Sequence, residues 1–325
     1  MQLELPGLCD LQVNGFAGVD FNSPATTEAD VMRAIDRLRA TGVTRFLPTL
    51  ITSSRERFSQ CARRLAQTNH AAIAGLHLEG PYIAAEDGPR GAHPREHVVP
   101  ASVEDFARRQ DAAEGRIRLV TLAPEVPGGL ALIDYLVARG VRVAIGHTAA
   151  KPAQIRDAVK AGATLSTHLG NGCAQLLARH PNFLWEQLAA DELHASLIAD
   201  GHHLPPATMK AMVRAKTPAR TMLITDAVAA AGCAPGRYEL NGELVELSPE
   251  GRVTPPGKPW LAGSSLTLDC AVANAVKFAG VPFAAAWAMA STQPAQFLGL
   301  QPAGKVRVKW HAAEFRFEEL RVLEA

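Results

Sequence analysis

Two kinds of segment alternate along most of the chain. Short apolar runs rich in β-branched residues are separated by longer stretches in which apolar residues recur at helical spacing. We count eight apolar runs, at residues 8–14, 45–51, 73–79, 117–123, 142–147, 164–169, 194–199 and 221–225. The amphipathic stretches between them lie at 28–40, 55–67, 103–111, 130–138, 152–161 and 206–215. This alternation is typical of a parallel sheet wrapped by helices, so it predicts an α/β fold.

Residues that start helices support these boundaries. Thr27 and Ser54 stand directly before two of the amphipathic stretches, and Pro152 and Pro206 open two others. Eight strand–helix units favour a closed (β/α)₈ barrel of the TIM type over an open doubly wound sheet. The open sheet would normally carry a Gly-x-Gly-x-x-Gly turn after its first strand, and the sequence lacks one.

The pattern changes after the eighth run. Polar and apolar residues alternate over 238–247 around Asn241-Gly242, which predicts a β-hairpin inserted at about 236–259. Two helical stretches, 268–278 and 284–290, and a strand-like tail at 306–322 follow. We therefore expect a barrel domain over residues 1–305, including the hairpin, and a short C-terminal strand segment over 306–325.

Composition narrows the classes of function. The 325 residues carry a formal net charge of only +1, so no global field attracts nucleic acid or a membrane. The five cysteines are odd in number and lack a Cys-x-x-Cys pair, which argues against a disulfide scaffold or a thiolate zinc site. With no leader-like start and no apolar run long enough to span a bilayer, we expect a cytoplasmic protein.

Acids and imidazoles stand at the ends of successive predicted strands. They are Glu79, His147, His168, His203 and Asp226. In a barrel all strand ends open onto one face, where active sites are built, so these side chains are expected to converge.

Their chemistry indicates a metal site. Two histidines and a carboxylate from different strands are suitable ligands for Zn²⁺ and leave a position for water. A buried unpaired carboxylate such as Glu79 needs a cation or donor nearby, and Asp226 is placed to act as a general base. Any single histidine in an apolar run is more often a core residue, but their joint placement favours a site. We interpret His77 as structural, on the opposite face of its strand, and Asp200 as the cap of a turn.

Longer motifs extend across most of the chain in the same order as in one known family. They are Gly-Leu-His-Leu-Glu-Gly-Pro-Tyr at 75–82, Gly-Ala-His at 91–93, Val-Thr-Leu-Ala-Pro-Glu at 120–125, Gly-His at 146–147, Thr-His-Leu at 167–169, Ile-Ala-Asp-Gly-His-His at 198–203, Ile-Thr-Asp-Ala at 224–227 and Leu-Ala-Gly-Ser-Ser-Leu-Thr at 261–267. The sequence resembles N-acetylglucosamine-6-phosphate deacetylases of the amidohydrolase superfamily.

The resemblance implies a role for each matching residue. Glu79, His147 and His168 would hold the principal metal and Asp226 would be the acid/base. His203 would bond the acetamide carbonyl. The remaining residues are implied to contact substrate. They are His93 at the sugar, Asn171 at the phosphate with Gly172 beside it in the substrate site, Arg179 reaching the same phosphate from the neighbouring subunit of a homodimer, and the backbone of Ser265, Leu266 and Thr267 around the sugar pocket.

The chain departs from the family in four places. Gln12-Val13-Asn14 stands where many members have His-x-His. Amide side chains are weak zinc ligands, so we predict one divalent ion per chain, foremost Zn²⁺, with Fe²⁺ or another divalent ion as an alternative. Whether a second ion binds weakly near Gln12 and Asn14 stays open. Residues 170–173 are smaller than usual, which predicts a wider or more flexible pocket. His-Pro-Asn follows Arg179 where the family usually has Glu-Pro-Gly, at the position of the phosphate contact that crosses between subunits. The chain also begins almost at the first barrel strand, so the accessory β-sandwich domain is expected to be truncated or absent.

These inferences predict an enzyme that removes the N-acetyl group from an N-acetylamino sugar 6-phosphate, foremost N-acetyl-D-glucosamine 6-phosphate. The sugar epimer stays open. One alternative is the same chemistry on a different N-acyl or cyclic amide substrate, since a fold does not fix a substrate. A second is a sugar-phosphate binding protein without catalysis, which would need neither an activated water nor a base.

Overall fold

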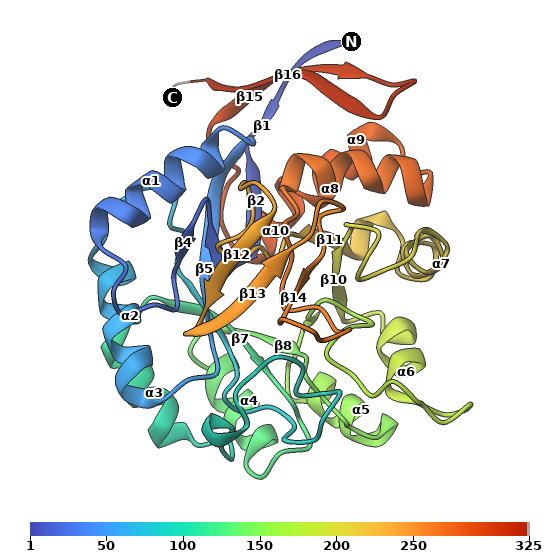
Figure 1. Ribbon diagram of the computed structural model, residues 1–325. Coiled ribbons are helices and arrows are strands. Elements are labelled where there is room, and N and C mark those ends of the chain that lie inside the picture. The colour runs from blue at the N-terminus through green and yellow to red at the C-terminus, as the bar shows by residue number, and fades with distance from the viewer. Residues whose placement is uncertain (324–325) are drawn as a thin grey trace.

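An eight-stranded parallel sheet forms the centre of the computed structural model, which describes residues 1–323 (Figure 1). Its strands, in spatial order, are β2 (Leu8–Val13), β5 (Val43–Ile51), β6 (Leu76–Glu79), β7 (Ile117–Leu122), β8 (Arg142–Ile145), β9 (Leu165–Ser166), β10 (His194–Ile198) and β11 (Thr221–Ile224). The two edges meet where the Asp226 N–H donates to the Gln12 carbonyl at 3.0 Å and the Asn14 N–H to the Ala227 carbonyl at 2.7 Å. The predicted TIM-type barrel is confirmed.

A helix follows each barrel strand and packs on the outside, so that the helices encircle the sheet in Figure 1. They are α1 (Glu28–Arg39), α2 (Arg55–Gln67), α3 (Val103–Ala112), α4 (Gly129–Val137), α5 (Pro152–Lys160), α6 (Phe183–Ala189), α7 (Pro206–Lys216) and α8 (Leu268–Asn274), after which come α9 (Phe283–Met289) and α10 (Thr292–Phe297). Single 3₁₀ turns lie at Arg95–His97 and Pro218–Arg220, and a π-helical turn at Ala275–Ala279 continues α8 without a break. The sequence pattern did not predict α6 and α10, which are seven and six residues long.

The predicted helix starts are present. Thr27 forms a reciprocal cap with Asp30, whose N–H donates to Thr27 Oγ1 at 3.2 Å. Ser54 Oγ accepts from the Arg57 N–H at 3.2 Å, and Pro152 and Pro206 occupy first turns.

Polar side chains fill one level of the barrel interior beneath the strand ends. His77 Nε2 lies 2.8 Å from Thr121 Oγ1, which lies 2.7 Å from Thr167 Oγ1, and His77 Nδ1 is 3.3 Å from Thr49 Oγ1. Residues two apart in a strand share a face, so His77 points inward with Glu79, and placing it on the opposite face was wrong. Burial lowers the pKa of His77 to about 4, so its ring is neutral in this network.

The predicted hairpin crosses the mouth of the barrel (Figure 1). It consists of β12 (Gly236–Leu240), β13 (Glu243–Leu247) and β14 (Val253–Thr254), an antiparallel unit that we call the strap (residues 236–254). Its tip is tied to the barrel, since the Asn241 N–H donates to Asp20 Oδ2 at 2.7 Å, next to the short strands β3 (Gly15–Phe16) and β4 (Val19–Asp20).

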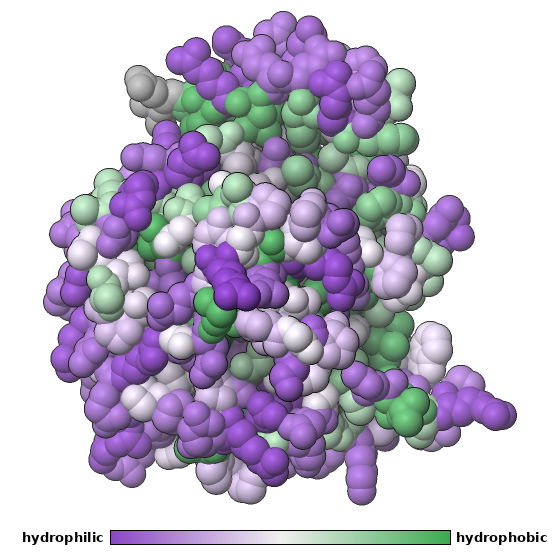
Figure 2. Space-filling view, viewed as in Figure 1, coloured by the Kyte–Doolittle hydropathy of each residue, from purple (hydrophilic) through white to green (hydrophobic). Residues whose placement is uncertain are grey.

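A three-stranded sheet lies outside the ring of helices. It pairs β1 (Gln2–Pro6) with β15 (Lys305–His311), which pairs with β16 (Arg316–Leu323). Residues 2–6, which the sequence grouped with the barrel, belong to this sheet, and the last two residues of the expected 306–325 segment lie outside the described residues. Trp310 and Phe317, with ring centroids 5.0 Å apart, pack on α9, where apolar surface gathers between sheet and barrel in Figure 2.

Within residues 1–323, none of the helices combines the length and the apolar character needed to cross a membrane.

Candidate metal centre and substrate cavity

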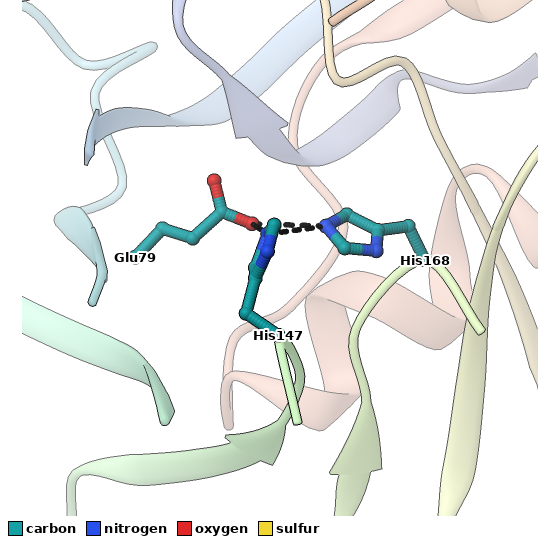
Figure 3. Close-up of side chains that lie close together, drawn as sticks. All are labelled: Glu79, His147 and His168. Atoms are coloured by element: carbon teal, nitrogen blue, oxygen red, sulfur yellow. Dashed lines mark hydrogen bonds and ion pairs between the residues drawn. The ribbon is translucent and has the colours of Figure 1, made fainter. Parts of the chain in front are cut away.

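Glu79, His147 and His168 meet at the carboxyl ends of the strands (Figure 3). Glu79 is the last residue of β6, and the two histidines follow β8 and β9 by two residues each. His147 Nε2 and His168 Nε2 lie 3.3 and 3.1 Å from Glu79 Oε1 and 3.1 Å from each other. All three side chains are buried, so three potential ligand atoms face one point.

This geometry fits a divalent metal. Around tetrahedral zinc, with bonds of about 2.0–2.1 Å, neighbouring ligand atoms stand about 3.3 Å apart, close to the spacings in the cluster. His147 Nδ1 lies 2.9 Å from the Pro89 carbonyl, a partner that keeps a proton on Nδ1, so that a bound metal ion would take the lone pair of Nε2. The sequence did not reveal this carbonyl, because a backbone partner 58 residues away leaves no residue-type signal.

The charges within the cluster are strongly coupled. Burial disfavours the ionised form of Glu79, yet the hydrogen bonds to His147 and His168 hold its pKa well below the usual value. Burial also opposes charge on His168, but Glu79 outweighs it and raises the pKa of the imidazole. A buried carboxylate that remains ionised beside two imidazoles is a strong attractor for a cation.

Asp226, two residues after β11, lies beside this cluster and accepts hydrogen bonds from two amides. Asn14 Nδ2 donates to Asp226 Oδ1 at 2.7 Å, and Gln12 Nε2 donates both to Asp226 Oδ1 at 3.0 Å and to Glu79 Oε1 at 2.8 Å. Burial, followed by repulsion from Glu79, raises the pKa of Asp226. The amide N–H groups therefore point at the carboxylates and connect the two acids.

The backbone is strained at the three strand ends that carry this chemistry. His147, His168 and Asp226 have φ values of +50°, +29° and +51°. Residues with side chains rarely adopt this region, and each such residue costs roughly 1–3 kcal/mol. Strain of this kind clusters at functional sites, where the surrounding structure fixes it.

Asp200 positions His203. Its Oδ1 accepts from the N–H groups of His202 and His203, both at 2.8 Å, as expected of a turn cap. Its Oδ2 also lies 2.7 Å from His203 Nδ1, a contact that the sequence interpretation missed. Burial opposes ionisation of Asp200, but the bond to His203 lowers its pKa. Because Asp200 engages Nδ1, the other ring nitrogen of His203, Nε2, is not used in this contact.

His93 packs with a tilted ring against His147, one of the three side chains that could hold a metal. Its ring lies 4.3 Å from that of His147, and its Nδ1 is 2.8 Å from Thr52 Oγ1. Burial, followed by the charge of His147, lowers the pKa of His93 well below its usual value, so His93 is a neutral hydrogen-bonding group.

A cavity of about 1280 Å³ opens above these residues. Of the predicted site residues it is lined by Glu79, His93, His147, His168, Asn171, Gly172, His203 and Asp226. Arg179 is exposed and does not line it, and neither do Ser265, Leu266 and Thr267, which lie just beyond Gly263 on its wall. Arg252 and Trp260, which the sequence did not single out, do line it.

Comparison with known proteins gives consistent relatives. Residues 4–313 match the amidohydrolase family. The chain is 37% identical over 304 residues to an N-acetylgalactosamine-6-phosphate deacetylase of Escherichia coli O157:H7, covering 92% of this chain and 79% of that one. It is 37% identical over 313 residues to a human N-acetylglucosamine-6-phosphate deacetylase, covering 91% and 74%. The solved structure of a mutant N-acetyl-D-glucosamine-6-phosphate deacetylase from Mycobacterium smegmatis, in complex with N-acetyl-D-glucosamine-6-phosphate, superposes with a TM-score of 0.90 at 31% identity, covering 98% of this chain and 85% of that one.

Proposed function

The chain belongs to the amidohydrolase family, and we propose that it is a deacetylase that hydrolyses N-acetyl-D-glucosamine 6-phosphate to acetate and glucosamine 6-phosphate. The observation that carries the proposal is the convergence of Glu79, His147 and His168 beside Asp226 at the mouth of a barrel. This site unites ligands for a metal with a carboxylate able to move a proton, which a sugar-binding protein would not need.

The ligand set suits one ion, and Zn²⁺ is our first choice. Such an ion lowers the pKa of a bound water and polarises a carbonyl. The amides of Gln12 and Asn14 use their N–H groups as donors to Glu79 and Asp226, which supports a single tightly held ion.

Asp226 acts as general base and then as general acid. Its carboxylate takes a proton from the attacking water and returns that proton to the amine nitrogen when the C–N bond breaks. Asn14 and Gln12 hold the carboxylate by the donors described above. His203 donates from Nε2 to the acetamide oxygen, with Asp200 fixing the ring through Nδ1.

The remaining substrate contacts are proposed from the resemblance, and the cavity lining supports some of them. His93 and the polar groups of Asn171 and Gly172 line it on the sides next to the cluster. We assign His93 to the sugar and Asn171 with Gly172 to the phosphate, while the backbone from Ser265 to Thr267 is assigned to the far side of the sugar.

Arg179 would complete the phosphate site from the second subunit of a homodimer. It lies on an exposed segment with Leu176, which is 92% exposed, and Trp185, which is 53% exposed. Apolar side chains exposed together on one segment favour a protein contact there. If Arg179 acts across the interface, mixing inactive Arg179→Gln and His168→Ala chains restores activity to about a quarter of the wild-type value, because mixed dimers hold one intact site. No recovery on mixing would place Arg179 within its own subunit or outside the site.

Acetate release by zinc-loaded protein tests the function directly. We expect N-acetyl-D-glucosamine 6-phosphate to be cleaved with a kcat/KM far above that of the unphosphorylated sugar. The 6-phosphates of N-acetylgalactosamine and N-acetylmannosamine belong in the same assay, because one relative of equal identity carries the galactosamine name. A protein that binds about one zinc per chain but releases no acetate from any of these would refute the substrate assignment.

A further inference from the structure

The strap forms part of the cavity wall and is hydrogen-bonded to loops of the barrel. At the turn between β13 and β14, the Glu250 carbonyl lies 2.9 Å from His202 Nε2, and the Gly251 carbonyl accepts from Ser265 Oγ at 2.8 Å. The next residue in the chain is Arg252. Its backbone is therefore tied to the loop that carries His203 and to the segment after Gly263.

The guanidinium of Arg252 lies at the cavity wall and has no carboxylate partner within residues 1–323. Its side chain is half-buried and lines the cavity, and its one side-chain hydrogen bond runs to the Pro259 carbonyl at 3.4 Å. No ion pair within residues 1–323 includes it. Arg90, the other guanidinium on the cavity wall, is already paired with Asp87 and donates to the His93 carbonyl.

A guanidinium offers five N–H donors in a planar fork that matches phosphate oxygens. Arg252 uses one of them weakly, so its remaining donors and its full charge are available to a ligand. Arg179 of the same chain does not line this cavity. Arg252 on the strap is therefore the arginine that a chain can offer, without an ion-pair partner, to a substrate in its own cavity.

We propose that Arg252 binds the phosphate of the substrate from within the same subunit and makes the enzyme selective for phosphorylated sugars. This inference rests on the proposed deacetylase function and adds a residue that discriminates between substrates. Within residues 1–323, Arg252 makes no hydrogen bond or ion pair with Asp226 or with the three metal-binding side chains. It is therefore expected to act on substrate binding and not on the chemical step.

Steady-state kinetics of Arg252→Gln test the proposal. Losing a charged hydrogen-bond pair raises KM for N-acetyl-D-glucosamine 6-phosphate by about 10- to 100-fold, with kcat nearly unchanged. The rate with the unphosphorylated sugar stays the same, and inhibition by inorganic phosphate weakens by a similar factor. Arg252→Lys recovers part of the KM, because it restores the charge but not the fork.

Arg237→Gln is the matched control, since Arg237 is an exposed arginine of the strap that does not line the cavity and is paired with Glu246. It is expected to change no parameter. A KM for Arg252→Gln within twofold of the wild-type value, in protein with normal zinc content, overturns the role of Arg252 while leaving the deacetylase function intact. If the wild-type enzyme itself does not distinguish phosphorylated from unphosphorylated sugar, the proposed function and this inference both fail.

Discussion

Replacing Asp10 by Asn isolates the electrostatic cost of a carboxylate buried beneath the site. Asp10 lies in β2 and is fully buried. Its Oδ2 accepts from Thr225 Oγ1 at 2.7 Å, and its Oδ1 accepts from the N–H groups of Gln12 and Thr225 at 3.2 and 3.3 Å. These bonds tie β2 to the segment after β11 that leads to Asp226.

An Asn side chain can keep every one of these contacts. Its Oδ1 takes the place of the oxygen that accepts from the two backbone N–H groups, and its Nδ2 can donate to the Thr225 hydroxyl. That hydroxyl then turns its proton to the Gln12 carbonyl, which lies 3.3 Å away. The variant therefore resembles the protonated form of Asp10 and differs from the ionised form mainly by the charge.

The pKa gives the size and the sign of the effect. Burial raises the pKa of Asp10 from 3.8 to about 7, against the opposing hydrogen bonds from Thr225 and Gln12. Below pH 3.8 the carboxyl group of Asp10 is protonated in both the folded and the unfolded protein. Between the two pKa values this group is ionised in the unfolded protein but protonated in the folded protein, so the stability of the wild type falls as pH rises. A shift of this size corresponds to about 4 kcal/mol. The stability of Asp10→Asn relative to wild type is expected to rise by that order between pH 4 and pH 7 and then level off.

Urea unfolding of zinc-loaded wild type and variant at a series of pH values measures this difference, from which the titration of all shared groups cancels. Thr225→Val is a useful companion, because it removes the hydroxyl donor and is expected to destabilise the protein most at high pH. A difference between Asp10→Asn and wild type that stays flat from pH 4 to pH 8 would show that burial does not hold the carboxyl neutral. A difference that falls with rising pH would show that its neighbours favour the ionised form.

Three further predictions concern the site itself. Asp226→Asn is expected to retain zinc and fold but to lower kcat by about 10²- to 10⁴-fold, measured as acetate release, and an unchanged kcat would remove Asp226 from the mechanism. His147→Ala or His168→Ala should lose zinc first, as read by elemental analysis, and normal zinc content would refute their assignment as ligands. Asp200→Asn is expected to cost about 10- to 100-fold in kcat with zinc content unchanged, because the ring of His203 loses the carboxylate that orients it; activity at the wild-type level would mean that the contact is only a turn cap.

The sequence predicted the elements and residues whose cause is local. Apolar runs marked all eight barrel strands, because each strand is buried on both faces and its pattern does not depend on distant residues. Glu79 was identifiable because an acid at the end of such a run has to find a partner there. The barrel topology then turned strand ends that are far apart in sequence into neighbours, which is why the cluster with His147 and His168 could be expected.

The features that the sequence could not predict depend on contacts between distant segments. Arg252 has the appearance of an ordinary surface arginine until the strap docks, and the docking uses the bond between Asn241 and Asp20, which are 221 residues apart. Likewise β1 pairs with β15 near the other end of the chain. The docking of the strap and the pairing of β1 with β15 both depend on strand register and side-chain direction, which the periodicity of the sequence does not encode.

The strained backbone at the strand ends bears on whether this site is catalytic or merely binds a ligand. His147, His168 and Asp226 all have positive φ, at a combined cost of several kcal/mol at about 1–3 kcal/mol each. A sugar-phosphate binding site can be built from unstrained loops, because it needs only complementary contacts. Here the strained residues are the two imidazoles and the acid assigned to the reaction, and hydrogen bonds to Pro89, Glu79 and Asn14 hold their side chains in place. Five other non-glycine residues within 1–323 also have positive φ, but none of them carries a group assigned to the reaction. Because such strain persists only where the surrounding structure fixes it, its presence at all three groups that would hold a metal and move a proton favours catalysis over binding alone.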